Sequence, residues 1–321
     1  MKRTKMTFLL SEICLFILLL LCMHLIFSGE KPQKRVAVIV EKSGDEKWDS
    51  FINGLKQAAG IRNIHLIICN TDEIEDAQEE KSLICEQLDN QVDAFIVQAA
   101  PGEDTGAMLR EIRSQKPVLL VANGVPKEPE NGKRTQYPEL PAVMPDNYGM
   151  GYALGEDLNI RGKRIGIVGG LAETECSRER AKGVLDALSG TGCEIRFHIH
   201  TTYDMAITEK LRKEKAVDYL IVLETSALEQ IAGMYAQENG NHPGIYGIGN
   251  SIKCVYYLDE AVVEGLVATD GYDMGYQSVL EISGALKNQL YIMKNRETAY
   301  RLLHKEDIFR EEVQQFLHTY D

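Results

Sequence analysis

The chain has 321 residues, of which 44% are hydrophobic and only 9 are proline, and its formal net charge is −13 at pH 7. This length and composition describe a folded chain with room for two domains and exclude an intrinsically disordered protein. Because so acidic a surface repels phosphate backbones, we expect no nucleic acid partner.

The first 34 residues contain a long apolar segment. No charged residue occurs between Ile13 and Phe27, and with the apolar residues before it this run reaches about 20 residues, enough to span a bilayer. We therefore predict an N-terminal membrane anchor or signal segment over 1–34. Signal cleavage would place a bulky residue at the −3 position, and lipidation would need small residues before Cys22, which three leucines precede. Both remain alternatives to an uncleaved anchor.

The next part of the chain alternates strands with helices. A short, apolar, β-branched run predicts a strand at 35–40, and apolar residues at helical spacing predict a helix at 48–59. The alternation continues with strands at 65–69, 94–97 and 117–122 and with helices at 74–88 and 103–115. Strands and helices in this order predict a mostly parallel sheet with helices on both faces.

A polar, proline-marked sequence after Asn123, PKEPENGKRTQYPELP, interrupts the alternation and predicts a crossing loop. The pattern then resumes with strands at 164–168, 194–198, 219–223 and 244–248 and with helices at 148–158, 178–188, 208–213 and 227–238. From Val255 onward there follow a strand near Leu266, a helix at 274–286, a strand at 300–303 and a last helix. We predict two α/β lobes of similar plan that share these final pieces.

Enzyme signatures are scarce along the chain. The glycine cluster at 166–170 lacks the spacing of a dinucleotide-binding loop, and neither a phosphate-binding loop nor a nucleophile elbow occurs. His198 and His200 could supply two metal ligands but have no third partner nearby in the sequence. The five cysteines after residue 34 are odd in number and lack metal-ligand spacing, so we expect buried thiols. We predict no catalytic residues, no metal and no cofactor.

Several strings, in order, resemble the sugar-type periplasmic binding proteins, which are ribose- and galactose-binding-protein-like substrate-binding proteins of ABC transporters. RVAVIVEKSGDEKWDSFINGLKQAA looks like the first strand and helix of that family, and PVLLVANGVP resembles its lobe-crossing strand. VMPDNYGMGYALGEDL and CSRERAKGVLDAL are similar to two of its helices, the second of which carries an arginine and a glycine. AQEEKSLICEQLDNQVDAFIVQ, IYGIGNSIK and EGLVATDGYDMGYQSVLEI match further family segments, so that the resemblance covers about residues 35–310.

The resemblance implies two doubly wound parallel-sheet lobes joined by a multi-strand hinge, the periplasmic binding protein-like I fold. We expect the first lobe at 35–123 plus about 250–269, and the second at 124–249 plus about 270–321. Ligands of open α/β sheets bind outside the carboxyl ends of the strands, so the cleft between two such lobes is the expected site. The resemblance also implies an extracytoplasmic location for the lobes.

The family's ligand contacts carry over to ten positions, which are Glu41, Asp45, Trp48, Gln98, Asn123, Arg178, Tyr203, Glu224, Asn250 and Asp270. Trp48 either stacks on a sugar or packs on the sheet as part of the stripe with Phe51 and Leu55. Arg178 either grips two ligand oxygens or forms a surface pair with a neighbouring glutamate.

The implied function is capture of a small polar ligand, a sugar or sugar derivative, for an ABC permease, without catalysis. The alternatives are a ligand-sensing partner of a membrane histidine kinase or chemoreceptor and, from another class, a membrane-anchored α/β enzyme. The family's sugar-gripping Asp-Arg pair is replaced by Asn123 and Gly124, and Gly249 stands where an aspartate is expected. This departure and the many acids among the candidate residues also allow an amino sugar or another cationic solute.

Overall fold

The computed structural model describes residues 12–20, 22–23, 33–125, 140–158, 162–238 and 242–318. The chain divides into two compact units, Met1–Lys34 and Arg35–Asp321. In the first unit, residues 12–20 and 22–23 are helical, and the rest of the expected anchor lies almost wholly outside the described residues. Within the described ranges no helix has the length and apolar character needed to cross a membrane.

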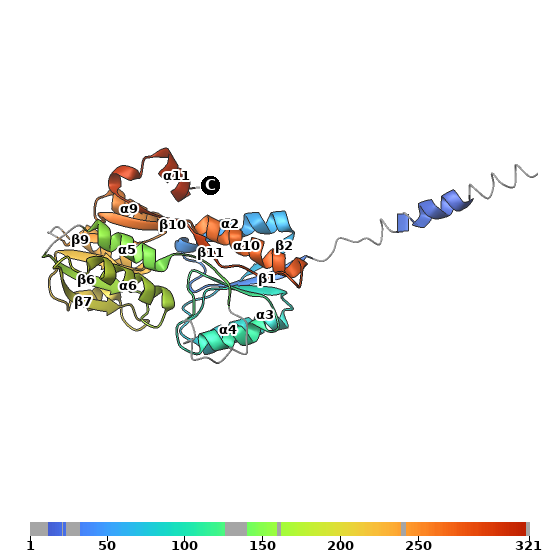
Figure 1. Ribbon diagram of the computed structural model, residues 1–321, viewed down its shortest axis with the longest axis horizontal. Coiled ribbons are helices and arrows are strands. Elements are labelled where there is room, and N and C mark those ends of the chain that lie inside the picture. Colours follow the sequence, from blue (N-terminus) through green and yellow to red (C-terminus); the bar gives the residue numbers. More distant parts are fainter. Residues whose placement is uncertain are drawn as a thin grey trace, which may run out of the picture. The chain divides into compact units, whose positions relative to one another are not determined.

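The second unit contains two six-stranded sheets (Figure 1). The strand order of the first sheet is β11-β5-β4-β3-β1-β2. Its strands are β1 (Lys34–Ile39), β2 (Ile64–Ile68), β3 (Ala94–Val97), β4 (Val118–Val121), β5 (Ala142–Pro145) and β11 (Arg296–Thr298). The pairs β1–β3, β3–β4, β4–β5 and β5–β11 are parallel, as the alternating sequence predicts.

The second sheet has the order β12-β10-β9-β8-β6-β7. Its strands are β6 (Arg164–Gly169), β7 (Glu194–His200), β8 (Tyr219–Val222), β9 (Gly244–Ile248), β10 (Gly265–Thr269) and β12 (Tyr300–Leu303). All neighbours are parallel except β12, which runs antiparallel to β10 at the edge. The expected fold of two doubly wound parallel-sheet lobes is therefore confirmed.

Helices cover both faces of each sheet, and each face has its own apolar core. On the first sheet, α2 (Asp49–Arg62) and α10 (Gly271–Lys287) pack on one face, and α3 (Ala77–Asp89) and α4 (Thr105–Arg113) on the other. On the second, α5 (Asn147–Asp157) and α6 (Glu175–Leu188) cover one face. The other face carries α7 (Ile207–Leu211), α8 (Thr225–Gln237), α9 (Ile252–Asp259) and α11 (Glu311–His318). Two 3-10 turns, η1 (Glu46–Trp48) and η2 (Lys305–Asp307), complete the order.

The limits of the lobes differ from those expected. Strand β5 pairs with β4 and so belongs to the first lobe, whereas β10 pairs with β9 and belongs to the second. Helix α10 returns to the first lobe, where Gly275 lies so close to α2 that an added Cβ would meet the carbonyl oxygen of Phe51 at 2.1 Å. The chain therefore crosses between the lobes after Pro145, after Thr269 and between β11 and β12, because backbone pairing and helix packing decide lobe membership.

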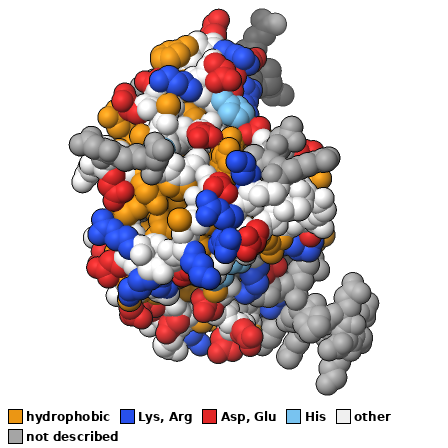
Figure 2. Space-filling view, turned by 90° about the vertical axis from the view of Figure 1, so that its left-hand side faces the viewer, with side chains coloured by type: hydrophobic (Ala, Val, Ile, Leu, Met, Phe, Trp, Pro, Cys, Tyr) orange, Lys and Arg blue, Asp and Glu red, His pale blue; other side chains and the backbone are white. Residues whose placement is uncertain are grey.

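The acidic excess of the sequence is not gathered into one field on the face seen in Figure 2. There, Lys and Arg side chains lie among Asp and Glu side chains around a hydrophobic area. Interspersed charges of this kind keep a surface soluble without a strong local potential.

Candidate functional site

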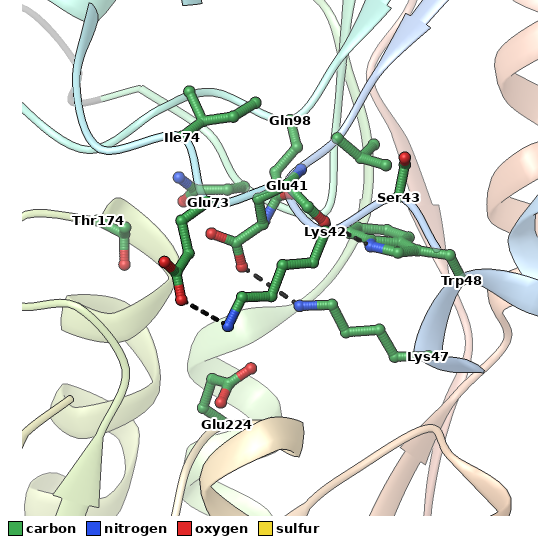
Figure 3. Close-up of polar contacts among 12 residues, drawn as sticks. Glu41, Lys42, Ser43, Lys47, Trp48, Glu73, Ile74, Gln98, Thr174 and Glu224 are labelled. Carbon is green, nitrogen blue, oxygen red and sulfur yellow. Dashed lines mark hydrogen bonds and ion pairs between the residues drawn. The ribbon is translucent and has the colours of Figure 1, made fainter. Parts of the chain in front are cut away.

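A cavity of about 210 Å³ lies between the two lobes, next to the carboxyl ends of the strands (Figure 3). Glu41 and Gln98 follow strands of the first sheet, and Glu224 and Asn250 follow strands of the second. The carboxyl ends of parallel strands meet at one edge of a sheet, so the two edges together present polar side chains to one space.

Seven of the ten residues expected at the site line this cavity, and they are Glu41, Trp48, Gln98, Asn123, Tyr203, Glu224 and Asn250. The other three lie elsewhere. Asp45 precedes η1, where its carbonyl oxygen accepts from the backbone N–H of Trp48 at 3.0 Å. Asp270 caps α10 by accepting from the backbone N–H of Asp273 at 2.8 Å.

Arg178 does not line the cavity. Its guanidinium is exposed and donates to the carboxylate of Glu175 at 2.9 Å and 3.3 Å. The pair forms because the two residues are one helical turn apart on α6. The alternative interpretation of Arg178, a surface ion pair with a neighbouring glutamate, is the one that the structure shows.

The first-lobe wall of the cavity carries two ion pairs. Lys47 Nζ lies 3.2 Å from Glu41 Oε1, and Lys42 Nζ lies 2.8 Å from Glu73 Oε1. Figure 3 shows both lysine side chains reaching into the space beside these carboxylates, with Glu224 of the second lobe on the opposite side. On this wall, the carboxylates of Glu41 and Glu73 are therefore each neutralised by a lysine of the same lobe.

These contacts also shift the pKa of each lysine. Burial opposes the charge of Lys47, but the carboxylates of Glu224, Glu41 and Asp45 outweigh it, so the pKa of Lys47 is raised. The hydrogen bond to Glu73 is the main reason why the pKa of Lys42 is raised, against partial burial. Both side chains are therefore cations at neutral pH.

Trp48 belongs to the apolar core of the first lobe and also lines the cavity. Its indole N–H donates to the carbonyl oxygen of Glu41 at 2.9 Å, and its ring lies 5.5 Å from that of Phe51. Because only 5% of the residue is exposed, its ring is a fixed part of the cavity wall. Its N–H is already engaged by the backbone.

The second-lobe wall carries Arg180 and Glu224. The guanidinium of Arg180 donates to Asn147 Oδ1 at 2.8 Å and to the carbonyl oxygen of Leu223 at 2.9 Å. Glu224 caps α8, accepting from the backbone N–H of Ala227 at 3.0 Å. The hydrogen-bond partners of Arg180 and Glu224 are neutral groups, which fix both side chains without compensating their charges. Both charges therefore act on the cavity.

Two hydrogen bonds join the lobes beside the cavity. Tyr203 of the second lobe donates its hydroxyl to the carbonyl oxygen of Ile74 at 3.0 Å. Asn123 of the first lobe accepts from the backbone N–H of Cys176 at 3.2 Å while its amide donates to Ala99 O at 2.8 Å. The lobes are thus in contact around the cavity.

Sequence reasoning missed four charged residues of the cavity, which are Lys42, Lys47, Glu73 and Arg180. A signal for Arg180 was available, since Arg180, and not Arg178, stands three residues before Gly183 in the family-like helix. Gly183 packs so closely on α5 that an added Cβ would meet the carbonyl oxygen of Tyr148 at 2.1 Å, which fixes the rotation of α6. No family-like string singled out Lys47, which lies between Glu46 and Trp48.

A metal site does not emerge from the described ranges, where no group of three or more His, Cys, Asp or Glu residues is placed to hold an ion. The rings of His198 and His200 lie with their centroids 4.4 Å apart and their planes tilted by 40°. His200 Nδ1 lies 3.2 Å from the carbonyl oxygen of Gly170, so its contact is with the backbone.

The family model described as periplasmic binding protein domain matches residues 36–289. Among solved structures, a carbohydrate transporter solute-binding protein from Agrobacterium radiobacter in complex with D-arabinose is similar, with a TM-score of 0.78 and 13% identity, over 90% of this chain and 100% of that one. A glucose-galactose binding protein from Geobacillus stearothermophilus has a TM-score of 0.72 and 18% identity, over 87% and 100%.

An ABC transporter solute-binding protein from Burkholderia graminis, also in complex with D-arabinose, has a TM-score of 0.74 and 16% identity, over 87% of this chain and 98% of that one. At such identities the likeness shows the shared fold. Among curated proteins, none matches the sequence of this chain.

Proposed function

The chain belongs to the family of periplasmic binding protein domains, and from that premise we propose that it captures a small polar solute, a sugar or sugar derivative, for an ABC-type permease. The observation that carries this proposal is the cavity of about 210 Å³ between the lobes, lined by polar side chains of both. A ligand that contacts both walls favours the closed arrangement of the lobes, and a docking partner can sense that arrangement. In this role the protein performs no chemistry.

The chemistry of the lining supports a carbohydrate ligand. Trp48 and Phe51 offer aromatic surface for the C–H groups of a sugar ring. Hydroxyl and amide side chains around them can exchange hydrogen bonds with sugar hydroxyls, and these are Gln98, Asn123, Thr174, Thr201, Thr202, Thr225, Ser226 and Asn250. The bound D-arabinose of two structural neighbours is consistent with this ligand class.

Thermal unfolding of the full chain with a panel of pentoses, hexoses, amino sugars and sugar acids tests the proposal. A ligand present at about 100 times its Kd should add about 2.7 kcal/mol to the free energy of unfolding and raise the Tm accordingly. A panel in which no sugar raises the Tm would contradict it, as would turnover of a sugar that binds.

We further propose that the lobes act outside the cytoplasm and that residues 1–34 tether them to the membrane. The apolar run from Ile13 to Phe27 supports a tether. Mass spectrometry of the protein extracted from membranes should find the original N-terminus. A mature chain that begins near Glu30, or a lipid on Cys22, would show processing instead.

A further inference from the structure

Lys47 occupies an unusual position for a cation, because its ammonium lies inside the ligand cavity. Only 12% of its side chain is exposed, and Nζ is 3.2 Å from Glu41 Oε1. The residue lies in η1, directly before Trp48, whose buried ring anchors the turn. The ammonium is therefore held in the cavity by packing as well as by charge.

A second carboxylate acts on Lys47 from the other lobe. Glu224 is fixed at the start of α8 by the backbone N–H of Ala227 and faces the two lysines across the cavity (Figure 3). Its charge and that of Glu41 both favour the protonated amine. Glu41 and Glu224 thus form a cation position that spans the two lobes, and the chain fills this position with its own side chain.

The remaining charges of the cavity are balanced in the same way. Lys42 neutralises Glu73, and Arg180 adds a third cation, so the two walls together carry three carboxylates and three cations. The abundance of acids, which in the sequence suggested a cationic solute, therefore leaves no excess negative charge in the cavity. An ammonium group brought by a ligand would instead meet the ammonium groups of Lys42 and Lys47, and such like-charge contact disfavours binding.

We propose that Lys47 is a specificity-determining residue that fills the cation position between Glu41 and Glu224, so that the cavity accepts neutral or acidic sugars and rejects amino sugars. This inference rests on the proposed sugar-binding function for its ligand class. A neutral or acidic sugar offers oxygen acceptors to the N–H groups of Lys47 that Glu41 does not engage, whereas an amino sugar adds a cation where one is already present.

The cation position can be tested without any sugar by chemical rescue. Lys47→Ala removes a propylammonium group, so n-propylammonium chloride should raise the Tm of this variant by about 2 °C or more above an equal concentration of NaCl, in a saturable manner. The wild type and Lys56→Ala, which alters an exposed lysine of α2, should show no such rise. In the double variant Lys47→Ala/Glu224→Gln the rescue should weaken, because one of the two carboxylates has lost its charge.

The ligand preference is tested with matched sets of sugars on the full chain. Glucosamine and glucuronate each differ from glucose at one substituent, and the corresponding galactose derivatives each differ from galactose at one substituent. In the wild type, the amino sugar should bind at least about tenfold more weakly than its neutral parent, a difference that one like-charge contact can produce. Lys47→Met, which keeps an unbranched side chain one atom shorter and without the charge, should raise the affinity for the amino sugar about tenfold, whereas Lys56→Met should not.

The two experiments separate the inference from the function on which it rests. If no sugar of any class binds but propylammonium rescues Lys47→Ala alone, the sugar-binding function fails and the cation position stands. If propylammonium affects wild type and variant alike, or if wild type prefers the amino sugar, Lys47 does not have this role. Should Lys47→Ala fail to fold, the amino-sugar preference of the wild type and of Lys47→Met decides the question.

Discussion

The two walls of the cavity are supported by side chains of opposite character. In the first lobe, the buried carboxyl of Glu80 on α3 accepts from the backbone N–H of Ala100 at 3.3 Å, just after β3. In the second, the guanidinium of Arg180 on α6 donates to the carbonyl oxygen of Leu223, just after β8. Each lobe thus uses one long side chain from a covering helix to hold the strand end that faces the ligand.

The two supports differ in how they respond to pH. Burial raises the pKa of Glu80 to about 8, although the hydrogen bond from Ala100 acts in the opposite direction. Within the described part of the chain, Glu80 Oε2 makes no hydrogen bond. An arginine, by contrast, stays protonated at any pH at which the protein is folded. The support that Glu80 gives to the first-lobe wall therefore depends on the protonation of its carboxyl, whereas the support that Arg180 gives to the second-lobe wall does not change with pH.

The largest expected effect is that of Glu80→Gln on the pH dependence of stability. The native carboxyl keeps its proton up to a pH of about 8, whereas the unfolded chain releases it near 4.5. The contribution of Glu80 is therefore fully present below pH 4.5 and is lost as the pH rises toward 8, by about 1.4 kcal/mol per pH unit at most. Relative to wild type, Glu80→Gln should become more stable as the pH rises.

Urea unfolding of both proteins at pH 5, 6, 7 and 8 measures this slope. Glu79→Gln, at the exposed neighbouring position on α3, is the matched control. A difference between Glu80→Gln and wild type that stays constant from pH 5 to pH 8 would show that the carboxyl is not held protonated in the folded chain.

Arg180→Ala tests the second wall and should cost about 2–3 kcal/mol of unfolding free energy. The substitution leaves the carbonyl oxygen of Leu223 and the side chain of Asn147 without their charged donor. Arg178→Ala, two residues earlier on the same helix, removes only an exposed pair with Glu175 and should cost less than about 1 kcal/mol. Equal losses in denaturant unfolding of the two variants would mean that Arg180 does not support the wall.

The smallest expected effect concerns the contact between the walls. Tyr203→Phe removes the hydroxyl that donates to the carbonyl oxygen of Ile74 across the cleft. The substitution should destabilise the closed arrangement of the lobes by about 1 kcal/mol. Small-angle X-ray scattering of the ligand-free protein should then show a larger radius of gyration than wild type at the same pH. Tyr256→Phe, on the exposed surface of α9, should leave the scattering unchanged.

The sequence predicted most of the strands and helices of both lobes because their apolar periodicity is strong, but it did not predict helix α9 or strand β11. Strand β5, with its sequence AVMP, was not predicted, since it is too short and too near the proline-marked loop to show a period. The assignment of the last segments of the chain to one lobe or the other was also not predictable in detail. Nothing local in the sequence of α10 distinguishes packing on α2 from packing on a helix of the other lobe.

The residues that line the cavity were likewise predictable only in part. Residues that directly follow a strand, such as Glu41, Gln98 and Glu224, could be placed there because the end of a parallel strand points to the cleft. Arg178 and Arg180 are two residues apart on one helix, so their side chains point in directions about 200° apart. The close packing of Gly183 on α5, together with the buried residues Ala181 and Val184, turns Arg180 toward the cavity.

By itself, the sequence determined the alternation of strands and helices, the family-like strings and hence a two-lobed α/β chain with polar residues at its strand ends. Only the tertiary structure decided where the chain crosses between lobes, and which charges meet. Lys47 pairs with Glu41 six residues away and faces Glu224 from the other lobe. The approach of Glu224 depends on the docking of two independently wound sheets, and no local period or spacing encodes it.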